Sequence, residues 1–257
     1  MQIIRYLTEG AEAPLFGWLN EDRVGEIEGD IYAEFLRKEA DIPLEDIQFI
    51  TPVTPSKIIC VSMNYSARQI EFGEDESEHP LIFFKPPSSL IGPGDEIILP
   101  PQSDLVEHEA ELGVVIKKQG RWIEFDQVKN HILGYTVTND VTARDIQNSD
   151  KHWTRAKGFD TFCPVGPCID TSFKPLDAVI KCQVNEEVKQ FSSLSQMGYS
   201  VEQIIIYISS IMTLEPGDLI LTGTPAGSSQ LQDGDLVRVS IEGLGEIRNK
   251  VRNYERD

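Results

Sequence analysis

The sequence predicts a β-rich α+β fold that combines one large domain with a small N-terminal β domain. Short apolar runs bounded by glycine, proline, asparagine and aspartate recur along the chain, as expected for strands joined by turns. Only residues 201–212 repeat their apolar side chains at helical intervals over a long stretch. No internal repeat and no regular alternation of strands and helices is visible, which argues against a parallel βαβ array.

We assign residues 1–54 to a small β-rich domain with its connector, and residues 55–257 to a larger domain. Three short apolar runs in the first unit predict a meander of strands. Residues 41–55 contain three prolines, which remove hydrogen-bond donors and predict a connector without regular structure. The predicted strands are residues 3–7, 16–19 and 24–27.

The larger domain contains several predicted strands and one predicted helix. Ser200 and Gln203 have the spacing of a capping box and begin the helix, and the turn at residues 215–218 ends it. Alternating apolar residues around a glycine turn near the end of the chain predict a hairpin. The predicted strands are residues 57–61, 81–84, 96–99, 109–116, 134–139 and 219–222, and the hairpin covers residues 237–251.

Residues 66–79 have a different composition from their surroundings. The segment holds five acidic residues and few apolar ones, so we expect it to be solvated and mobile. Such a segment between two strands is either a lid over a site or a surface loop without that role.

Composition excludes several classes of function. The net charge is −19, with 23 basic and 42 acidic residues, and this charge repels nucleic acid and anionic membranes. No apolar run approaches the ~20 residues that span a bilayer, and no signal peptide is visible. The four cysteines form no CxxC pair, which favours buried thiols in a reducing cytoplasm over disulfides or zinc. We therefore expect a cytoplasmic protein.

Three acidic residues occupy alternate positions: Glu107, Glu109 and Glu111. In a strand, alternate side chains point to the same face, and three acids on one face repel one another unless cations or water intervene. Because the strand continues as a buried apolar run, a divalent metal such as Mg²⁺ or Mn²⁺ is one explanation. A solvated acidic face is the other. Asp140 ends a later apolar strand, where it is a candidate third ligand, a helix N-cap or a turn residue, and these roles are not exclusive.

Polar residues with possible binding roles follow these acids. Arg144, Gln147 and Lys157 lie in a segment that reads as irregular helix and loop. They are either surface residues or, beside a metal, groups that hold a substrate carboxylate. Gly223 and Thr224 follow a buried strand and offer close backbone approach and a hydroxyl, although the segment lacks the lysine of a phosphate-binding loop.

A set of short motifs connects these segments. They are, in order, Asn64-Tyr65, Phe84-Lys85-Pro86, residues 109–115, residues 140–145, residues 157–160, Gly166-Pro167 and residues 221–225. Each alone is unspecific. In this order and spacing they resemble the fumarylacetoacetate hydrolase (FAH) family, over about three-quarters of the chain.

The resemblance implies an FAH-type fold of rolled, mixed β-sheets with a divalent metal at one mouth. It implies Glu109, Glu111 and Asp140 as ligands of Mg²⁺ or Mn²⁺, with Glu107 outside this set. It also implies a small carboxylate substrate and a homodimer. The substrate-binding residues it implies are Arg144, Gln147, Gly223 and Thr224, and the catalytic residues are Lys157 and Glu71.

One position departs from the family pattern. Relatives that hydrolyse C–C bonds carry a histidine and a glutamate that activate water, whereas this chain has Arg68 at the histidine position, with Glu71 retained. Arginine is not a general base at neutral pH. Arg68 and Glu71, three residues apart, fit an ion pair on a helix surface. His79 is a possible replacement for the missing histidine, and His108 should face away from the ligands.

We therefore predict an enzyme that acts on a small 2-oxo or 2-hydroxydienoic (di)carboxylate through a metal-stabilised enolate, by decarboxylation or isomerisation. Hydrolysis of an acylpyruvate-type or fumarylacetoacetate-type C–C bond is one alternative. A non-catalytic protein that binds 2-oxo acids is the other.

Overall fold

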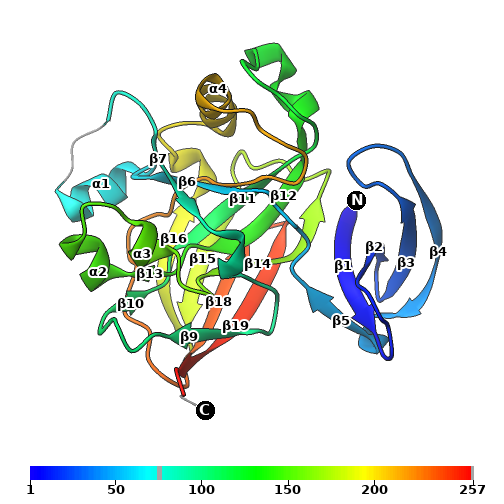
Figure 1. The fold of residues 1–257 in the computed structure, drawn as a ribbon, viewed down its shortest axis with the longest axis horizontal. Helices are drawn as coiled ribbons and strands as arrows, with labels where there is room; N and C mark the ends of the chain where they lie inside the picture. The colour runs from blue at the N-terminus through cyan, green and yellow to red at the C-terminus, as the bar shows by residue number, and fades with distance from the viewer. Residues whose placement is uncertain (74–76, 256–257) are drawn as a thin grey trace.

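The computed structural model describes residues 1–73 and 77–255, and its strands form two main sheets and one small one (Figure 1). The largest sheet has the strand order β4-β3-β2-β1-β14-β12-β11-β17-β6-β7, with β5 paired to β1 and β8 paired to β14. Its strands are β1 (Gln2–Thr8), β2 (Leu15–Asn20), β3 (Arg23–Gly29), β4 (Phe35–Pro43), β5 (Ile47–Ile50), β6 (Ile58–Ser62), β7 (Leu81–Lys85), β8 (Leu90–Ile91), β11 (Ala110–Ile116), β12 (Ile132–Asn139), β14 (Cys163–Asp170) and β17 (Leu219–Leu221).

The second sheet has the order β16-β15-β18-β19-β9, and a two-stranded ribbon pairs β10 with β13. Their strands are β9 (Glu96–Leu99), β10 (Val106–Glu107), β13 (Thr142–Ala143), β15 (Val179–Val184), β16 (Glu187–Ser193), β18 (Leu236–Ile241) and β19 (Gly245–Asn253). The helices are α1 (Ser66–Phe72), α2 (Arg144–Ser149), α3 (Thr154–Lys157) and α4 (Val201–Ile211), with 3₁₀ turns η1 (Leu44–Asp46), η2 (Pro87–Ser89), η3 (Phe125–His131) and η4 (Leu194–Gln196).

The main core lies where the second sheet packs on β11 and β12. Every residue of β11 is buried, because β12 and β17 pair with its two edges and apolar side chains cover both faces. In contrast, β15 and β18 alternate buried and half-buried residues, since only one face of that sheet meets the core. The difference explains why residues 110–116 read as one continuous apolar run.

The N-terminal strands join the rest of the molecule through backbone pairing. Strand β1 pairs antiparallel with β14, at Ile3 opposite Ile169, while β2, β3 and β4 extend the sheet outward (Figure 1). The domain boundary that we place at residue 54 falls between β5 and β6, and it stays a prediction.

Most of the predicted elements are present, and the β-rich α+β prediction is confirmed. Helix α4 begins with the predicted capping box, in which the Ser200 hydroxyl accepts from Gln203 N–H and the Gln203 side chain accepts from Ser200 N–H. Strands β18 and β19 form the predicted hairpin. Within residues 1–73 and 77–255, no helix is long and apolar enough to cross a membrane.

Two predictions about irregular segments are wrong. The supposed connector contains the end of β4 and all of β5, which is held by four residue pairs with β1. Residues 66–72 form helix α1 rather than a mobile loop, and its end is closed by Gly73 in the left-handed conformation. The part of the predicted lid at residues 74–76 lies outside the described residues.

Candidate active site

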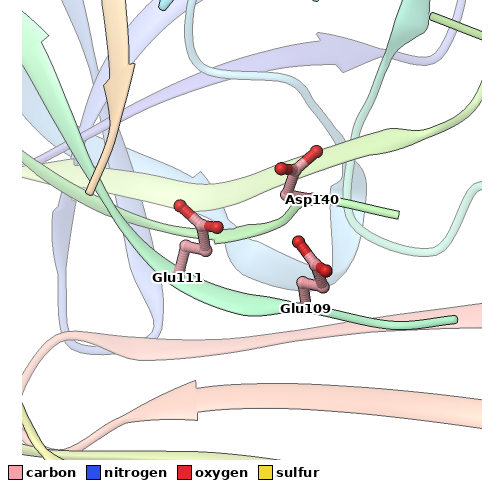
Figure 2. A group of neighbouring side chains, drawn as sticks. All are labelled: Glu109, Glu111 and Asp140. Carbon is pink, nitrogen blue, oxygen red and sulfur yellow. The ribbon is translucent and has the colours of Figure 1, made fainter. Parts of the chain in front are cut away.

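Three carboxylates from two adjacent strands meet at one end of the large sheet (Figure 2). Glu111 lies in β11, Glu109 directly precedes this strand, and Asp140 directly follows β12. All three are at least 96% buried, and one oxygen of each lies within 4.8 Å of the others. This group is the one that the sequence predicts as metal ligands.

The backbone around these acids fixes their positions. Ala110 pairs with Asn139 across β11 and β12, and the Asp140 N–H donates to the Glu109 carbonyl at 2.8 Å. The Asn139 side chain accepts from the Glu109 N–H at 2.9 Å. Asp140 is not a helix N-cap, because α2 begins after Ala143 and has no side-chain cap. The N-cap role that the sequence left open for Asp140 is therefore wrong.

Glu109 is surrounded by cations. Lys157 Nζ lies 2.7 Å from one of its oxygens, and Arg68 Nη2 lies 2.8 Å from the other, which Arg144 also contacts. Burial alone would raise the pKa of Glu109, but Lys157, Arg144 and Arg68 together outweigh it and hold the pKa well below its usual range. The negative charge of Glu109 is therefore balanced by the neighbouring cations.

Glu111 has the opposite environment. Its side chain accepts a hydrogen bond from the Gly223 N–H at 2.7 Å, and its near neighbours include two other carboxylates. Burial, followed by repulsion from Asp140 and Glu109, raises the pKa of Glu111 well above its usual value. A cation at this end would relieve that repulsion.

Asp140 lies between these two environments, because it contacts Lys157 and neighbours Glu111. Its Oδ2 accepts from Lys157 at 2.6 Å, and its Oδ1 forms an ion pair with Lys85 Nζ at 2.8 Å. Three buried carboxylates whose oxygens lie within 4.8 Å of one another, including the poorly compensated Glu111, fit a divalent ion with oxygen ligands. The three acids therefore satisfy the chemistry of a divalent-metal site.

Lys157, on α3, is a buried ammonium between two acids. Burial by itself would lower its pKa, but Asp140 and Glu109 outweigh that effect and raise it. Lys157 is thus held in the charged form, and its Nζ also lies 5.0 Å from the centre of the Phe83 ring.

The other predicted site residues gather around the same acids. Arg144, Gln147 and Thr224 line one pocket with the triad and Lys157, and Arg144 donates to Gln147. Gly223 donates its backbone N–H to Glu111 and does not itself line the pocket. Glu71 does not itself line the pocket; it is one-third exposed and is joined to the pocket through Arg68, from which it accepts at 2.6 Å, and it also accepts from the Gly227 N–H at 3.1 Å.

Glu107 lies apart from the three acids, on β10. It accepts from Arg144 Nε at 2.8 Å and from the Ser228 hydroxyl at 3.0 Å. Glu107 lies outside the predicted ligand set, but the expectation that all three alternate acids lie on one strand face is wrong, because the strand is interrupted between Glu107 and Ala110. Glu107 instead fixes the orientation of Arg144.

The histidines lie away from the triad oxygens. His108 faces the opposite side, as predicted, where its ring nitrogens contact Gln190 and Ser229 and burial lowers its pKa to about 4. His79 stacks against Tyr207 of α4, with ring centres 5.7 Å apart. It does not line the pocket and therefore does not replace the missing histidine.

Arg68 is the main site residue whose position sequence reasoning missed. The predicted ion pair with Glu71 exists, but Arg68 is 3% exposed and lines the pocket instead of lying on a helix surface. Lys85 and Gln190 were also missed. Lys85 pairs with Asp140, and Gln190 donates to the Thr224 hydroxyl at 2.8 Å. The only sequence signal for Lys85 was its place in the Phe84-Lys85-Pro86 motif.

The pocket between these side chains is small. Its volume is about 20 Å³, enough for one or two water molecules. Charged and polar side chains fill most of the space between the triad and the pocket mouth.

Comparison with known proteins identifies relatives over almost the whole chain. Residues 57–252 match the family described as fumarylacetoacetate (FAA) hydrolase, C-terminal, and residues 1–52 match the family described as Rv2993c-like, N-terminal. The chain is 44% identical over 223 residues to the bovine (Bos taurus) mitochondrial oxaloacetate tautomerase FAHD2A, covering 82% of this chain and 71% of that protein.

Solved structures show the same fold. The 2-hydroxyhepta-2,4-diene-1,7-dioate isomerase from Mycobacterium marinum superposes with a TM-score of 0.91 at 39% identity, with all of both chains covered. The maleylpyruvate hydrolase from Sphingobium sp. SYK-6, solved with manganese(II) and pyruvate, gives a TM-score of 0.81 at 28% identity and covers 99% of this chain and 100% of that one. The FAH-type fold predicted from the sequence is therefore confirmed.

Proposed function

Because the chain belongs to the fumarylacetoacetate hydrolase family, we propose that it is a divalent-metal-dependent enzyme that isomerises or decarboxylates a small 2-oxo or 2-hydroxydienoic dicarboxylate. One observation carries the choice of reaction. The acids, Lys157 and Arg144 form an intact site for an enolate, but the position of the water-activating histidine holds Arg68, a buried cation bound to Glu71 and Glu109. Proton transfer next to an enolate does not need that histidine, whereas the usual hydrolysis does.

Glu109, Glu111 and Asp140 would hold the ion, which we propose to be Mg²⁺ or Mn²⁺. When bound there, a divalent ion supplies a Lewis acid that polarises a 2-oxo carboxylate. Four cations (Arg68, Lys85, Arg144 and Lys157) face five carboxylates, including Glu71 and Glu107, so two further positive charges reverse the sign of the site. An anionic substrate can then enter a protein whose net charge is −19.

Each of the other side chains at the site has its own role in the reaction. Arg144 and Gln147 bind a substrate carboxylate through their planar donor groups. Lys157, held as an ammonium by Glu109 and Asp140, stabilises negative charge on the enolate oxygen. Glu71, which is bound to Arg68 beside the pocket, accepts the proton when the C3–H bond breaks and returns it to oxygen or carbon, so isomerisation is balanced without water. In decarboxylation, the C3–carboxyl bond breaks, CO₂ leaves and C3 takes a proton supplied by water.

The named activities of two relatives support this choice. One relative is named as an oxaloacetate tautomerase and one structural neighbour as a diene-dioate isomerase, and both reactions move a proton without splitting the carbon skeleton. The hydrolase neighbour shares the fold at lower identity, and its structure contains manganese and pyruvate. That complex supports a Mn²⁺ ion and a 2-oxo acid in the corresponding site of this chain.

The test is a panel assay with oxaloacetate, an acylpyruvate and a hydroxymuconate-type diene. Each compound is followed by ultraviolet absorbance and by NMR in D₂O, with Mn²⁺, with Mg²⁺ and with chelator. We expect metal-dependent keto–enol conversion, a shifted double bond or CO₂ release, and at least a 1000-fold slower reaction in Glu111→Gln, since one ligand of the Lewis acid is lost.

Other outcomes would replace this proposal. Cleavage of the acylpyruvate into two acids, abolished by Glu71→Gln, would establish C–C hydrolysis. Metal-dependent binding of oxalate without consumption of any compound would instead identify a binding protein.

A further inference from the structure

Arg68 and Arg144 share an aromatic side chain and a carboxylate oxygen. The guanidinium carbons lie 4.2 Å and 5.2 Å from the centre of the Phe72 ring, close enough for both cations to interact with its face. Each arginine also directs one Nη2 at the same oxygen, Oε1 of Glu109. The two arginines come from different helices, α1 and α2, and converge on one point.

The remaining contacts of each arginine fix its orientation. Arg68 donates through Nη1 to Glu71 at 2.6 Å and to the Ser228 hydroxyl at 2.8 Å. Arg144 donates through Nε to Glu107 at 2.8 Å. Both side chains are about 95% buried or more, so neither is a solvated surface charge. The pair is therefore a preorganised receptor for a carboxylate oxygen.

The Glu109 carboxylate occupies that receptor in this structure. Both arginines and Glu109 line the pocket, so a carboxylate that enters it competes with Glu109 for the same two donors. If Glu109 turns toward an ion shared with Glu111 and Asp140, both arginines lose a partner at the same atom. A carboxylate from the substrate is the group that restores those hydrogen bonds without leaving a buried cation unpaired.

We propose that Arg68, together with Arg144, binds the distal carboxylate of the substrate and restricts the enzyme to 2-oxo dicarboxylates rather than 2-oxo monocarboxylates. This inference rests on the proposed function and adds to it the residue that selects dicarboxylates. This position agrees with the proposed proton transfer at C3, because in a 2-oxosuccinate-type acid the distal carboxylate is attached to C3. Holding it at Arg68 places C3 next to Glu71, the proton acceptor, which is itself 2.6 Å from Arg68. Arg68 is thus a specificity-determining residue.

The first test compares two substrates that differ only at the distal group, oxaloacetate and 2-oxobutyrate. The rate measured is metal-dependent exchange of the C3 protons with D₂O. We expect the kcat/KM ratio of oxaloacetate to 2-oxobutyrate to fall by about 10- to 100-fold in Arg68→Met, as expected for loss of a hydrogen bond to a charged group. Arg68→Lys should retain an intermediate ratio. Arg252→Met, which removes an exposed arginine on β19, is the matched control and should keep the wild-type ratio.

A second test measures binding without turnover. Malate and 2-hydroxybutyrate differ by the same distal carboxylate, and their affinities in Mn²⁺ are obtained by calorimetry. The wild-type protein should bind malate at least tenfold more tightly, and Arg68→Met should lose most of that preference while still melting cooperatively. An unchanged preference in the folded variant would overturn the inference.

The two tests separate failure of this inference from failure of the proposed function. If the wild-type protein exchanges the C3 protons of neither substrate, the proposed function fails, although the malate preference still tests the role of Arg68. If both substrates exchange and the ratio does not depend on Arg68, only the inference about substrate class is wrong.

Discussion

Glu109 and Glu111 are two residues apart, face the same pocket and have opposite electrostatic environments. Three cations contact Glu109, and they hold its pKa well below the usual range. Glu111 has one backbone donor and two neighbouring carboxylates, and its pKa is raised. We call these the Glu109 end and the Glu111 end of the site.

The contrast shows how one row of acids serves two purposes. The Glu109 end is a cluster of cations grouped around a carboxylate, which is the arrangement that recognises a substrate anion. The Glu111 end is a cluster of acids short of positive charge, which is the arrangement that recruits a cation. Strand spacing places the acids on one face, but only the contacts from α1, α2 and α3 distinguish the two ends.

The strongest test of this contrast compares Glu109→Gln with Glu111→Gln in the metal-free protein. Glu109→Gln replaces the carboxylate beside three buried cations by a neutral amide. This change should lower the free energy of unfolding by about 3–5 kcal/mol. Glu111→Gln removes a buried acid that is repelled by its neighbours, so its stability should equal or exceed that of the wild type. Chemical denaturation with chelator present measures both, and equal losses would contradict the contrast.

The pH dependence of this difference has a definite sign. Folding lowers the pKa of Glu109, so its stabilisation is present above the unfolded value near 4.5 and is lost as the pH falls below it. The stability deficit of Glu109→Gln should therefore shrink in acid. Mn²⁺ should stabilise the wild type and neither variant, because each variant lacks one ligand.

A smaller effect is expected from Gly223→Ala, which disturbs the Glu111 end alone. Gly223 has φ +98°, and an added Cβ would lie 2.7 Å from Cβ of Asn64. The strain should cost about 1–3 kcal/mol and displace the N–H that donates to Glu111. We expect weaker Mn²⁺ binding by calorimetry, with the contacts of Lys157 to Glu109 preserved. Unchanged Mn²⁺ affinity would show that this donor does not position Glu111.

The smallest effect is expected at Glu107, which belongs to neither end. Glu107→Gln keeps an acceptor for Arg144 Nε but loses the charge, and the side chain is only partly buried. The loss of stability should be about 1 kcal/mol, and Mn²⁺ affinity should change by less than about threefold. A loss of metal affinity as large as that of Glu111→Gln would make Glu107 a fourth ligand.

Much of the site was predictable from sequence because its residues follow strands with clear patterns. Glu109, Glu111 and Asp140 lie at the ends of two fully apolar runs, and Lys157 and Thr224 belong to recognisable motifs. Arg68 was placed on a surface because its helix has a solvated face and because its partner Glu109 is 41 residues away in sequence. No pattern in the neighbouring sequence predicts such a long-range contact.

The missed secondary structure has a similar cause. Strand β4 is mostly exposed, so its residues do not alternate between apolar and polar. Strand β5 follows Pro43 and is held by pairing with β1, which a local pattern does not reveal. Helix α1 carries exposed Ile70 and a buried arginine, the reverse of an amphipathic pattern.

The pairing of the central sheet also constrains how the protein is made. Strand β6 pairs in parallel with β17, and Asn64 donates to the Thr222 carbonyl across 158 residues of sequence. At a synthesis rate of about 5–20 residues per second, β6 is made roughly 10–30 s before that partner. Strand β7 is made soon after β6 and pairs with one edge of it, but during this interval the other edge of β6 has unpaired backbone groups that are exposed to other chains. Early association with a chaperone, or slow translation before residue 219, should therefore affect the yield of folded protein more than it affects the stability of the finished fold.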